Sequence, residues 1–224
     1  DLRADRQPEF TQIDMEMSFV TEDGIMTMNE GLVKHVFKEI LNVDVPTPFL
    51  RMPYAEAMDR FGSDKPDTRF GLELQNVTDA VRSCGFAVFK NAVEAGGSVR
   101  ALNVKGAAAQ LSRKEIDKLT EVARTYGAKG LAYTRWTADA KSSSFEKFLT
   151  EDEIAALYAA ANVEEGDVLL IAADADSERA CTALGAVRLA VGAKLGLIDK
   201  SKFNFLWVTD FPLFEYSEEE SRFV

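Results

Sequence analysis

The first fourteen residues combine side chains that could bind a nucleotide and an amino acid. Arg3 and Arg6 lie in a charged loop, where guanidinium groups can donate paired hydrogen bonds to phosphates. Phe10, Gln12 and Asp14 follow at every second position. An aromatic ring and an amide can hold a purine, and a carboxylate can hold an ammonium group. From the pattern alone, a solvated hairpin with an exposed polar face is the simpler explanation.

These side chains need a strand to position them, and residues 9–19 have the pattern of one. Apolar and polar residues alternate there, which is the period of a β-strand. Phe10, Gln12 and Asp14 would share the polar face, and the other face would enter a core. A turn is expected at Glu22–Gly24. An amphipathic helix is expected over residues 28–41, because apolar residues recur there every three or four positions.

Three later features carry weaker chemical signals. Residues 62–67 read Gly-Ser-Asp-Lys-Pro-Asp, which predicts a surface loop after a short helix over residues 54–61. Residues 206–215 read as a buried strand ending in a turn at a proline. Gly185, Gly192 and Gly196 lie in or just after a helix without the spacing of a phosphate loop, so a packing role is expected for them.

Composition limits the kinds of site that the chain can contain. The 224 residues are 46% hydrophobic and carry a net charge of −11, which argues against a protein that grips nucleic acid by bulk charge. The single histidine, His35, rules out a multi-histidine metal site. No metal site is expected. Cys84 and Cys181 have no metal-ligand spacing around them, so two buried free thiols are expected.

Targeting signals are not evident in the sequence. No apolar run approaches the roughly 20 residues that span a bilayer, and the first residues do not resemble a signal peptide. The sequence begins at Asp1 within a strongly patterned segment, without a methionine. We therefore expect a fragment of a longer protein.

The middle of the chain predicts a self-contained α+β module. Strand-like runs are expected over residues 86–89, 99–104, 130–136 and 167–172. Ser112 with Glu115, and Thr150 with Glu153, have the spacing of capping boxes and predict helices that end near residues 126 and 161. An alanine-rich helix is expected over residues 177–195, followed by a strand over residues 203–209.

Residues 1–14 closely resemble motif 2 of the class II aminoacyl-tRNA synthetases, in the form typical of the bacterial aspartyl enzymes. Residues 62–67 resemble a segment near the start of the inserted domain of these enzymes, and residues 206–215 resemble the segment that returns to their catalytic sheet. Residues 71–190 resemble the inserted domain that they share with the B subunit of the tRNA-dependent amidotransferase. The resemblance covers essentially the whole chain.

The resemblance also implies roles for individual residues. Gln7 and Phe10 match ATP-binding positions of the family. Gln12 and Asp14 match aspartate-binding positions, and Asp1 and Arg3 match positions that contact the tRNA acceptor end. Phe10 matches the ring that stacks on adenine. No catalytic residue is expected within the chain, because the motif 2 and motif 3 arginines and the usual metal carboxylates lie outside this sequence.

The implied activity is that of an aspartate-tRNA ligase. Aspartate attacks the α-phosphate of ATP to give aspartyl-adenylate, and the aspartyl group then passes to the 3′ end of tRNA(Asp). Mg2+ accompanies ATP, and the enzyme acts mainly by positioning and charge stabilisation. The resemblance further implies a cytoplasmic homodimer without membrane association. We expect this chain alone to be inactive or nearly so.

The expected fold class is α+β: part of the antiparallel-sheet core of a class II synthetase with an inserted α+β domain. The expected divisions are a catalytic core segment over residues 1–70, the inserted domain over 71–190, and a return to the core over 191–224. One alternative is a non-catalytic module that binds tRNA or protein through the insert. Another is an asparaginyl or lysyl relative, which the large insert disfavours.

Overall fold

The computed structural model describes residues 9–214, 216–217 and 220–223. By its internal contacts the chain divides into two compact units, one ending at Phe49 and the other beginning at Leu50. In the described residues, no helix has the length and apolar character needed to cross a membrane.

The described part of the first unit contains one helix, α1 (Glu22–Leu41). The predicted helix over residues 28–41 is confirmed, but the turn predicted at Glu22–Gly24 is wrong, because these residues form the first helical turn. The Thr21 hydroxyl accepts a hydrogen bond from the Gly24 N–H at 3.2 Å, and the acidic residues of this turn favour a helix start. The helix ends at Asn42, which has a left-handed backbone.

The strand predicted over residues 9–19 is absent from the structure. Residues 10–17 have no regular secondary structure, and the whole segment is exposed. A strand is stable only when a neighbour satisfies its backbone hydrogen bonds, and none of the described strands pairs with this one. The alternating apolar side chains are consequently exposed, with Ile13 at 73% and Phe19 fully so.

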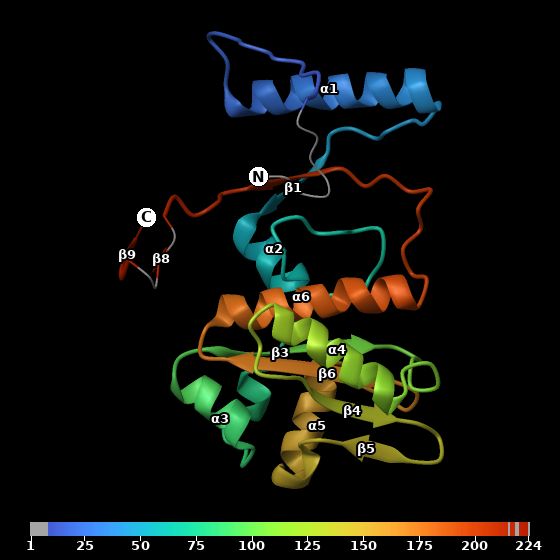
Figure 1. The fold of residues 1–224 in the computed structure, drawn as a ribbon, viewed down its shortest axis with the longest axis vertical. Helices are drawn as coiled ribbons and strands as arrows, with labels where there is room; N and C mark the ends of the chain where they lie inside the picture. The colour runs from blue at the N-terminus through green and yellow to red at the C-terminus, as the bar shows by residue number, and fades with distance from the viewer. Residues whose placement is uncertain (1–8, 215, 218–219, 224) are drawn as a thin grey trace. The chain divides into compact units, whose positions relative to one another are not determined.

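The second unit is built on a five-stranded antiparallel sheet of order β2-β3-β6-β4-β5. The strands are β2 (Gln75–Asn76), β3 (Ser98–Val104), β4 (Ala132–Trp136), β5 (Lys141–Ser143) and β6 (Val168–Asp174). The strands predicted over residues 99–104, 130–136 and 167–172 are confirmed to within two residues. At the centre, β3 pairs along its whole length with β6, and Leu102 lies opposite Leu170 (Figure 1).

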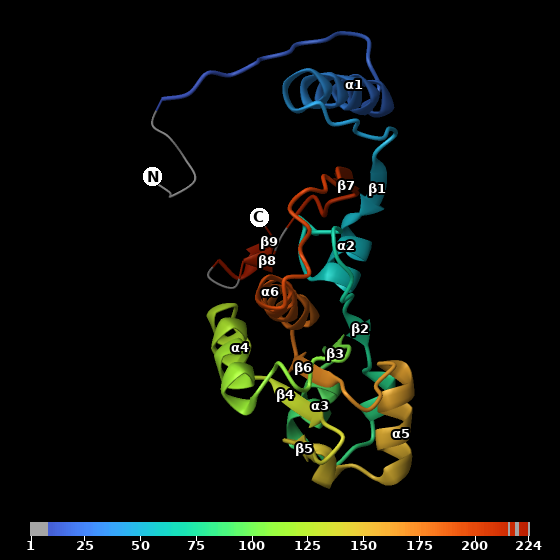
Figure 2. The ribbon, with the colours of Figure 1, turned by 90° about the vertical axis from the view of Figure 1, so that its right-hand side faces the viewer.

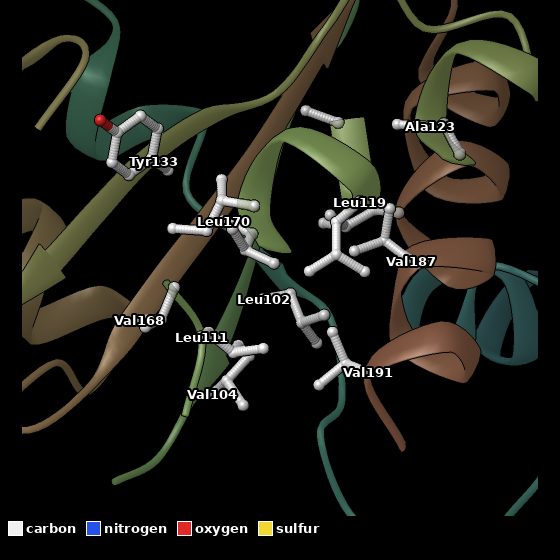
Figure 3. Packing of buried hydrophobic residues seen from close by; sticks show 14 of the residues in the cluster. Leu102, Val104, Leu111, Leu119, Ala123, Tyr133, Val168, Leu170, Val187 and Val191 are labelled. Carbon is white, nitrogen blue, oxygen red and sulfur yellow. The ribbon is translucent and has the colours of Figure 1, made fainter. Parts of the chain in front are cut away.

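Helices cover both faces of this sheet (Figure 2). On one face lie α4 (Arg113–Thr125) and α6 (Ser177–Lys194), and on the other lie α3 (Ala87–Glu94) and α5 (Glu151–Ala160). Successive side chains of a strand point to opposite faces. Leu170 therefore enters the core beneath α4 and α6, which Figure 3 shows, whereas Leu169 and Ile171 enter the other. This double coverage explains why β6 is an almost uninterrupted apolar run.

Of the two capping boxes predicted in this unit, one is present and the other is not. The Thr150–Glu153 capping box is confirmed, with both reciprocal hydrogen bonds present at 2.8 and 3.3 Å. The Ser112–Glu115 box is wrong, although α4 does begin after Ser112, because the serine side chain makes no capping hydrogen bond. Glu115 instead pairs with Lys118 and with Lys194 of α6, which joins the two helices.

The strand predicted over residues 86–89 is also wrong, because α3 begins at Ala87. A four-residue apolar run does not distinguish a buried strand from a helix start. Here the Phe86 ring packs edge-on against Phe89, with ring centroids 4.8 Å apart, and stacks on Phe148. Phe86 directly precedes the first residue of α3 and packs against the core beneath this helix.

A buried carboxylate fixes the turn before β6. Asp167 accepts hydrogen bonds from the backbone N–H groups of Gly106 and Glu164, at 2.8 and 3.0 Å, and from the Asn103 amide at 3.0 Å. Lys105 lies 3.2 Å away. Burial opposes the charged form, but these donors outweigh it and hold the pKa of Asp167 below its ordinary value.

Outside the five-stranded sheet, β1 (Leu50–Pro53) pairs in parallel with β7 (Leu206–Thr209). The predicted strand over residues 203–209 is thus confirmed in a shorter form. Helix α2 (Tyr54–Phe61) follows β1 directly and has the predicted bounds. The remaining short elements are the 3-10 helices η1 (Asp79–Val81) and η2 (Glu146–Phe148) and the strands β8 (Tyr216–Ser217) and β9 (Arg222–Phe223). The α+β fold class is confirmed.

Candidate functional site

Of the residues singled out in the first segment, the three that the structure describes do not form a site. Phe10, Gln12 and Asp14 are described and exposed, in a stretch without regular structure. Among the described residues, none of the three forms a side-chain hydrogen bond or an ion pair. Asp1, Arg3 and Gln7 lie outside the described residues. The roles assigned to these six positions remain predictions.

The second unit contains a cleft of about 820 Å³ between α2, α6 and the segment after β7. Tyr54 and Met58 of α2 line it together with Ser63 and Asp64 of the following loop. The opposite wall is formed by Glu178, Thr182, Gly185, Ala186 and Leu189 of α6, and the rim by Tyr126 and residues 211–214. The cleft therefore lies where the five-stranded module meets the β1–β7 pair.

The chemistry of this cleft is aromatic and acidic. The Tyr54 hydroxyl donates a hydrogen bond to Glu178 Oε1 at 2.8 Å, and the Tyr54 ring lies 5.0 Å from that of Phe211. Of the described residues that line the cleft, the charged ones are Asp64 and Glu178, and both are acidic. Such a lining disfavours phosphate groups, so the phosphates of ATP or tRNA do not fit here.

Helices α2 and α6 cross at two glycines. A Cβ atom built on Gly185 would lie 2.5 Å from the carbonyl oxygen of Gly62 and 2.6 Å from that of Phe61. Gly62 has a left-handed backbone, with a φ of 64°, and a Cβ there would lie 2.1 Å from the Cys181 carbonyl oxygen. Only glycine at both positions permits this approach without distortion.

The packing role expected for the α6 glycines is confirmed for two of the three. Gly192 lies against the Phe70 ring, because an added Cβ would approach two ring carbons to 2.7 Å. Gly196 differs, since it has a φ of 66° and nothing within 4 Å of an added Cβ. It follows the helix in the conformation that commonly terminates one.

Between these glycine contacts, Arg188 joins α6 to the chain that follows α2. Its side chain is 1% exposed. Nε donates a hydrogen bond to the Leu72 carbonyl at 2.8 Å, and Nη2 lies 2.8 Å from the Asp67 carbonyl, 3.0 Å from that of Phe70 and 2.9 Å from that of Gly71. One guanidinium thus holds four backbone carbonyls of a single loop.

Aromatic rings complete the environment of this arginine. Its Cζ lies 4.1 Å from the Phe70 ring centroid and 4.9 Å from that of Phe61. Burial lowers the pKa of Arg188 to about 10, against the opposing charges of Asp67 and Glu73. Among the described residues it forms no ion pair with a carboxylate. The charge is therefore held by neutral carbonyls and ring faces.

The loop held by Arg188 is also fixed from within. Asp67 accepts hydrogen bonds from Arg69 Nε at 2.9 Å and Nη2 at 2.8 Å, and this pairing lowers the pKa of the carboxyl group. The surface loop predicted over residues 62–67 is confirmed as a loop. Its close attachment to α6 was not predicted.

Sequence reasoning missed both Arg188 and the cleft. The cleft is formed by segments more than a hundred positions apart, which no local pattern relates. Arg188 did leave a signal. It directly follows Val187 and lies three positions before Val191, so a charged residue borders the apolar stripe of a helix that is otherwise rich in alanine. A charge at such a position is buried only when it is well paired or hydrogen-bonded.

The two cysteines are buried and free, as predicted. Burial raises the pKa of both thiols. In the described part of the chain, no group of three or more histidine, cysteine, aspartate or glutamate side chains is placed to hold a metal ion.

Comparison with known proteins relates the whole chain to one family. Residues 1–224 match the family described as tRNA synthetases class II (D, K and N). The chain is 60% identical over 225 residues to the aspartate–tRNA ligase of Agathobacter rectalis and 56% identical over 223 residues to that of Ruminiclostridium cellulolyticum. It is also 56% identical to the aspartate–tRNA(Asp/Asn) ligase of Lachnoclostridium phytofermentans. These matches cover 99–100% of this chain but 37% of the length of each relative.

Proposed function

Because this chain belongs to the class II tRNA synthetases of the D, K and N group, we propose that it is part of an aspartate-tRNA ligase. The observation that carries the proposal is the identity of 54–60% over essentially the whole chain to proteins named as aspartate-specific ligases. The proposed activity is ATP-dependent formation of aspartyl-adenylate, followed by transfer of the aspartyl group to the 3′ end of tRNA.

Within this activity, the first segment would supply part of the substrate site. We propose that Gln7 and Phe10 bind ATP and that Gln12 and Asp14 line the aspartate pocket. Asp1 and Arg3 would contact the tRNA acceptor end. The exposure of Phe10, Gln12 and Asp14 is compatible with these roles, since nothing within the described residues covers them. They would act together once the segment pairs with a neighbouring strand, which would bring alternate side chains onto one face.

Magnesium is proposed only as the companion of ATP. When bound with the nucleotide, it would neutralise the phosphates. The described residues do not fit a dedicated magnesium site, because they contain no suitable cluster of carboxylates. We therefore assign no magnesium ligand to them.

The proposed division of the chain is a core segment, an inserted module and a return to the core. The module would begin near residue 71. Helix α6 runs without interruption to Lys194, so the end expected at residue 190 falls inside it, and we place the boundary after the helix. The proposed protein is a cytoplasmic homodimer that uses ATP, L-aspartate and tRNA(Asp).

The proposal is tested on the longest natural polypeptide that contains this sequence. We expect ATP–pyrophosphate exchange with aspartate and not with asparagine or lysine. Asp14→Asn should abolish most of this exchange, whereas Met15→Leu, on the neighbouring exposed position, should leave it unchanged. Exchange supported equally by lysine or asparagine would refute the aspartate assignment.

The tRNA range is a separate question, because some relatives carry the name aspartate–tRNA(Asp/Asn) ligase. Charging of purified tRNA(Asp) and tRNA(Asn) by the same polypeptide answers it. Charging of tRNA(Asp) alone would indicate a discriminating enzyme, and charging of both would indicate a non-discriminating one.

A second candidate function is a non-catalytic binding module. The five-stranded sheet favours it, because it has an apolar core on each face and so resembles an independent folding unit. The 224-residue chain should then bind tRNA or a protein partner without binding nucleotide. Filter binding with labelled tRNA and equilibrium dialysis with ATP distinguish the two functions.

A further inference from the structure

The cleft between α2, α6 and the segment after β7 is bordered by large apolar side chains that are exposed. Leu213 is 86% exposed, Phe214 61% and Phe211 52%. Tyr126 and Leu189, which also line the cleft, are exposed as well. Scattered apolar residues are common on a protein surface, but a group of them around one hollow is typical of a surface that a partner covers.

Within this cleft, Glu178 is a carboxylate without a cationic partner. Its Oε1 atom accepts a hydrogen bond from the neutral Tyr54 hydroxyl at 2.8 Å, and among the described residues it forms no ion pair with a lysine or arginine. The second acid, Asp64, lies 3.6 Å from Lys65 Nζ, but Lys65 does not line the cleft and its side chain is 87% exposed. The described lining therefore carries negative charge and no cation of its own.

Aromatic rings lie beside this charge. The Tyr54 ring, whose hydroxyl holds Glu178, lies 5.0 Å from the Phe211 ring at an interplanar angle of 43°. Ring faces attract cations, and arginine is the cation most often found on them. Arginine and lysine also carry apolar stems that can lie along an apolar wall while the charged end meets a carboxylate. The cleft thus matches a basic side chain in both charge and apolar surface.

We propose that this cleft is a docking site for a polypeptide segment in which arginine or lysine alternates with apolar residues. One basic side chain of the segment pairs with Glu178 beside the Tyr54 and Phe211 rings. The apolar side chains next to it cover Leu213 and Phe214. This docking goes beyond the proposed ligase activity and does not depend on it.

Other occupants match the cleft less well. Nucleic acid and anionic lipid present phosphates, which the two carboxylates repel. A second copy of the chain carries the same net charge of −11, and a twofold contact at the cleft would place Glu178 against its own symmetry mate. A small amine would satisfy the charge but would leave the exposed apolar rim uncovered, whereas small-molecule sites enclose most of their ligand.

The test is isothermal titration calorimetry on the longest natural polypeptide that contains this sequence. The probe is a nine-residue peptide in which arginine alternates with leucine, with both ends blocked. We expect this peptide to bind at one site. A peptide with glutamate in place of arginine and a peptide with serine in place of leucine should show no measurable binding, because the first lacks the cation and the second lacks the apolar side chains.

Two variants assign the binding to the cleft. Glu178→Gln removes the charge but can still accept the Tyr54 hydrogen bond, and Leu213→Ser changes a side chain that lies outside the core. Each should weaken binding by about tenfold, the effect expected for one charged hydrogen bond or one covered leucine. The matched control is Glu94→Gln, which removes an equal charge from α3 on the opposite face of the sheet. It should leave binding unchanged.

The remaining outcomes each overturn the proposal. Absence of binding would show that the cleft does not accept such a segment or that the polypeptide already covers it. Equal weakening in Glu94→Gln and Glu178→Gln would show that overall charge attracts the peptide. Sedimentation of the wild type as a dimer and of Leu213→Ser as a monomer would identify a second copy as the occupant. ATP–pyrophosphate exchange is measured separately, so its absence would refute the proposed function without altering the interpretation of peptide binding.

Discussion

Replacing Gly185 by alanine tests the close contact between Gly62 and Gly185, where α2 and α6 cross, most directly. Helix propensity alone predicts stabilisation, because alanine is favoured over glycine in a helix interior by about 1 kcal/mol. The structure predicts the opposite. The new methyl group would lie 2.5 Å and 2.6 Å from the carbonyl oxygens of Gly62 and Phe61, and 2.9 Å from the Gly62 carbonyl carbon. All three are backbone atoms, which do not rotate away as a side chain does.

The expected magnitude combines these two effects. Overpacking of a tight contact costs about 1–3 kcal/mol, and a contact with rigid backbone belongs at the upper end. Subtracting the gain in propensity leaves a net loss of about 2 kcal/mol. For a unit of this size, each kcal/mol lowers the melting temperature by about 2–4 °C, so a decrease of about 4–8 °C is expected.

The assay is urea unfolding of the 224-residue chain, supported by thermal melts. Gly192→Ala is the matched control, since it lies in the same helix and has the same propensity gain. Its obstacle is the Phe70 ring, which is a side chain and not backbone, although it is buried against Arg188. We expect a clearly smaller loss of stability for Gly192→Ala than for Gly185→Ala. A Gly185→Ala protein as stable as the wild type, or more stable, would refute the description of this crossing as a backbone-to-backbone contact.

Three further predictions concern other parts of the second unit. Because the folded pKa of Asp167 lies below its ordinary value, its stabilising contribution is present above about pH 4 and is lost as the pH falls through the folded pKa. The pH values 5 and 3 lie roughly one unit either side of the ordinary pKa of an aspartate. Between them, urea unfolding should show a smaller loss of stability in Asp167→Asn than in the wild type. Equal losses would contradict the assignment. Thr150→Ala should cost about 1 kcal/mol through the lost cap, whereas Ser112→Ala should cost much less because its side chain makes no capping hydrogen bond; equal costs would argue against this difference. Cys84 and Cys181 should resist a thiol reagent at neutral pH in the folded chain, because both are buried and their pKa values are raised, and rapid labelling before unfolding would show otherwise.

Local patterns predicted the elements whose partners are also local or whose burial is complete. Helix α2 has the predicted bounds, and the Thr150 capping box forms because its two hydrogen bonds join residues three positions apart. Strand β6 was recognisable as an apolar run, and β3 and β4 as short strand-like runs that also contain polar residues. The run beginning at Phe86 was ambiguous, because four apolar residues suit either a strand or the start of a helix.

The failures arise where a segment depends on distant parts of the molecule. The alternation in residues 9–19 is clear, but alternation supplies only side chains for a strand, and the backbone still requires a neighbour. The Ser112–Glu115 spacing is correct for a capping box, yet Glu115 finds Lys194 on another helix. The cleft and the contacts of Arg188 join positions more than a hundred residues apart, and no window along the chain contains both partners.

The candidate substrate residues were identified by resemblance and not by physics. Phe10, Gln12 and Asp14 are suitable in type, but the structure leaves them exposed in a stretch without regular secondary structure. Their proposed roles depend on the match to a family motif. Direct substitution in an active polypeptide is therefore the appropriate test.

The strand order has a consequence for how the protein is made on the ribosome. β3 is complete at Val104, but its partner β6 begins only at Val168, so the centre of the sheet stays unpaired while more than sixty further residues are synthesised. β1 remains without its partner strand for longer, until β7 (Leu206–Thr209) has been synthesised. Apolar segments such as β3 are exposed throughout this interval, when nascent chains are most prone to aggregate. Synonymous changes or pauses between these strands should thus influence yield more than the same changes made after β7.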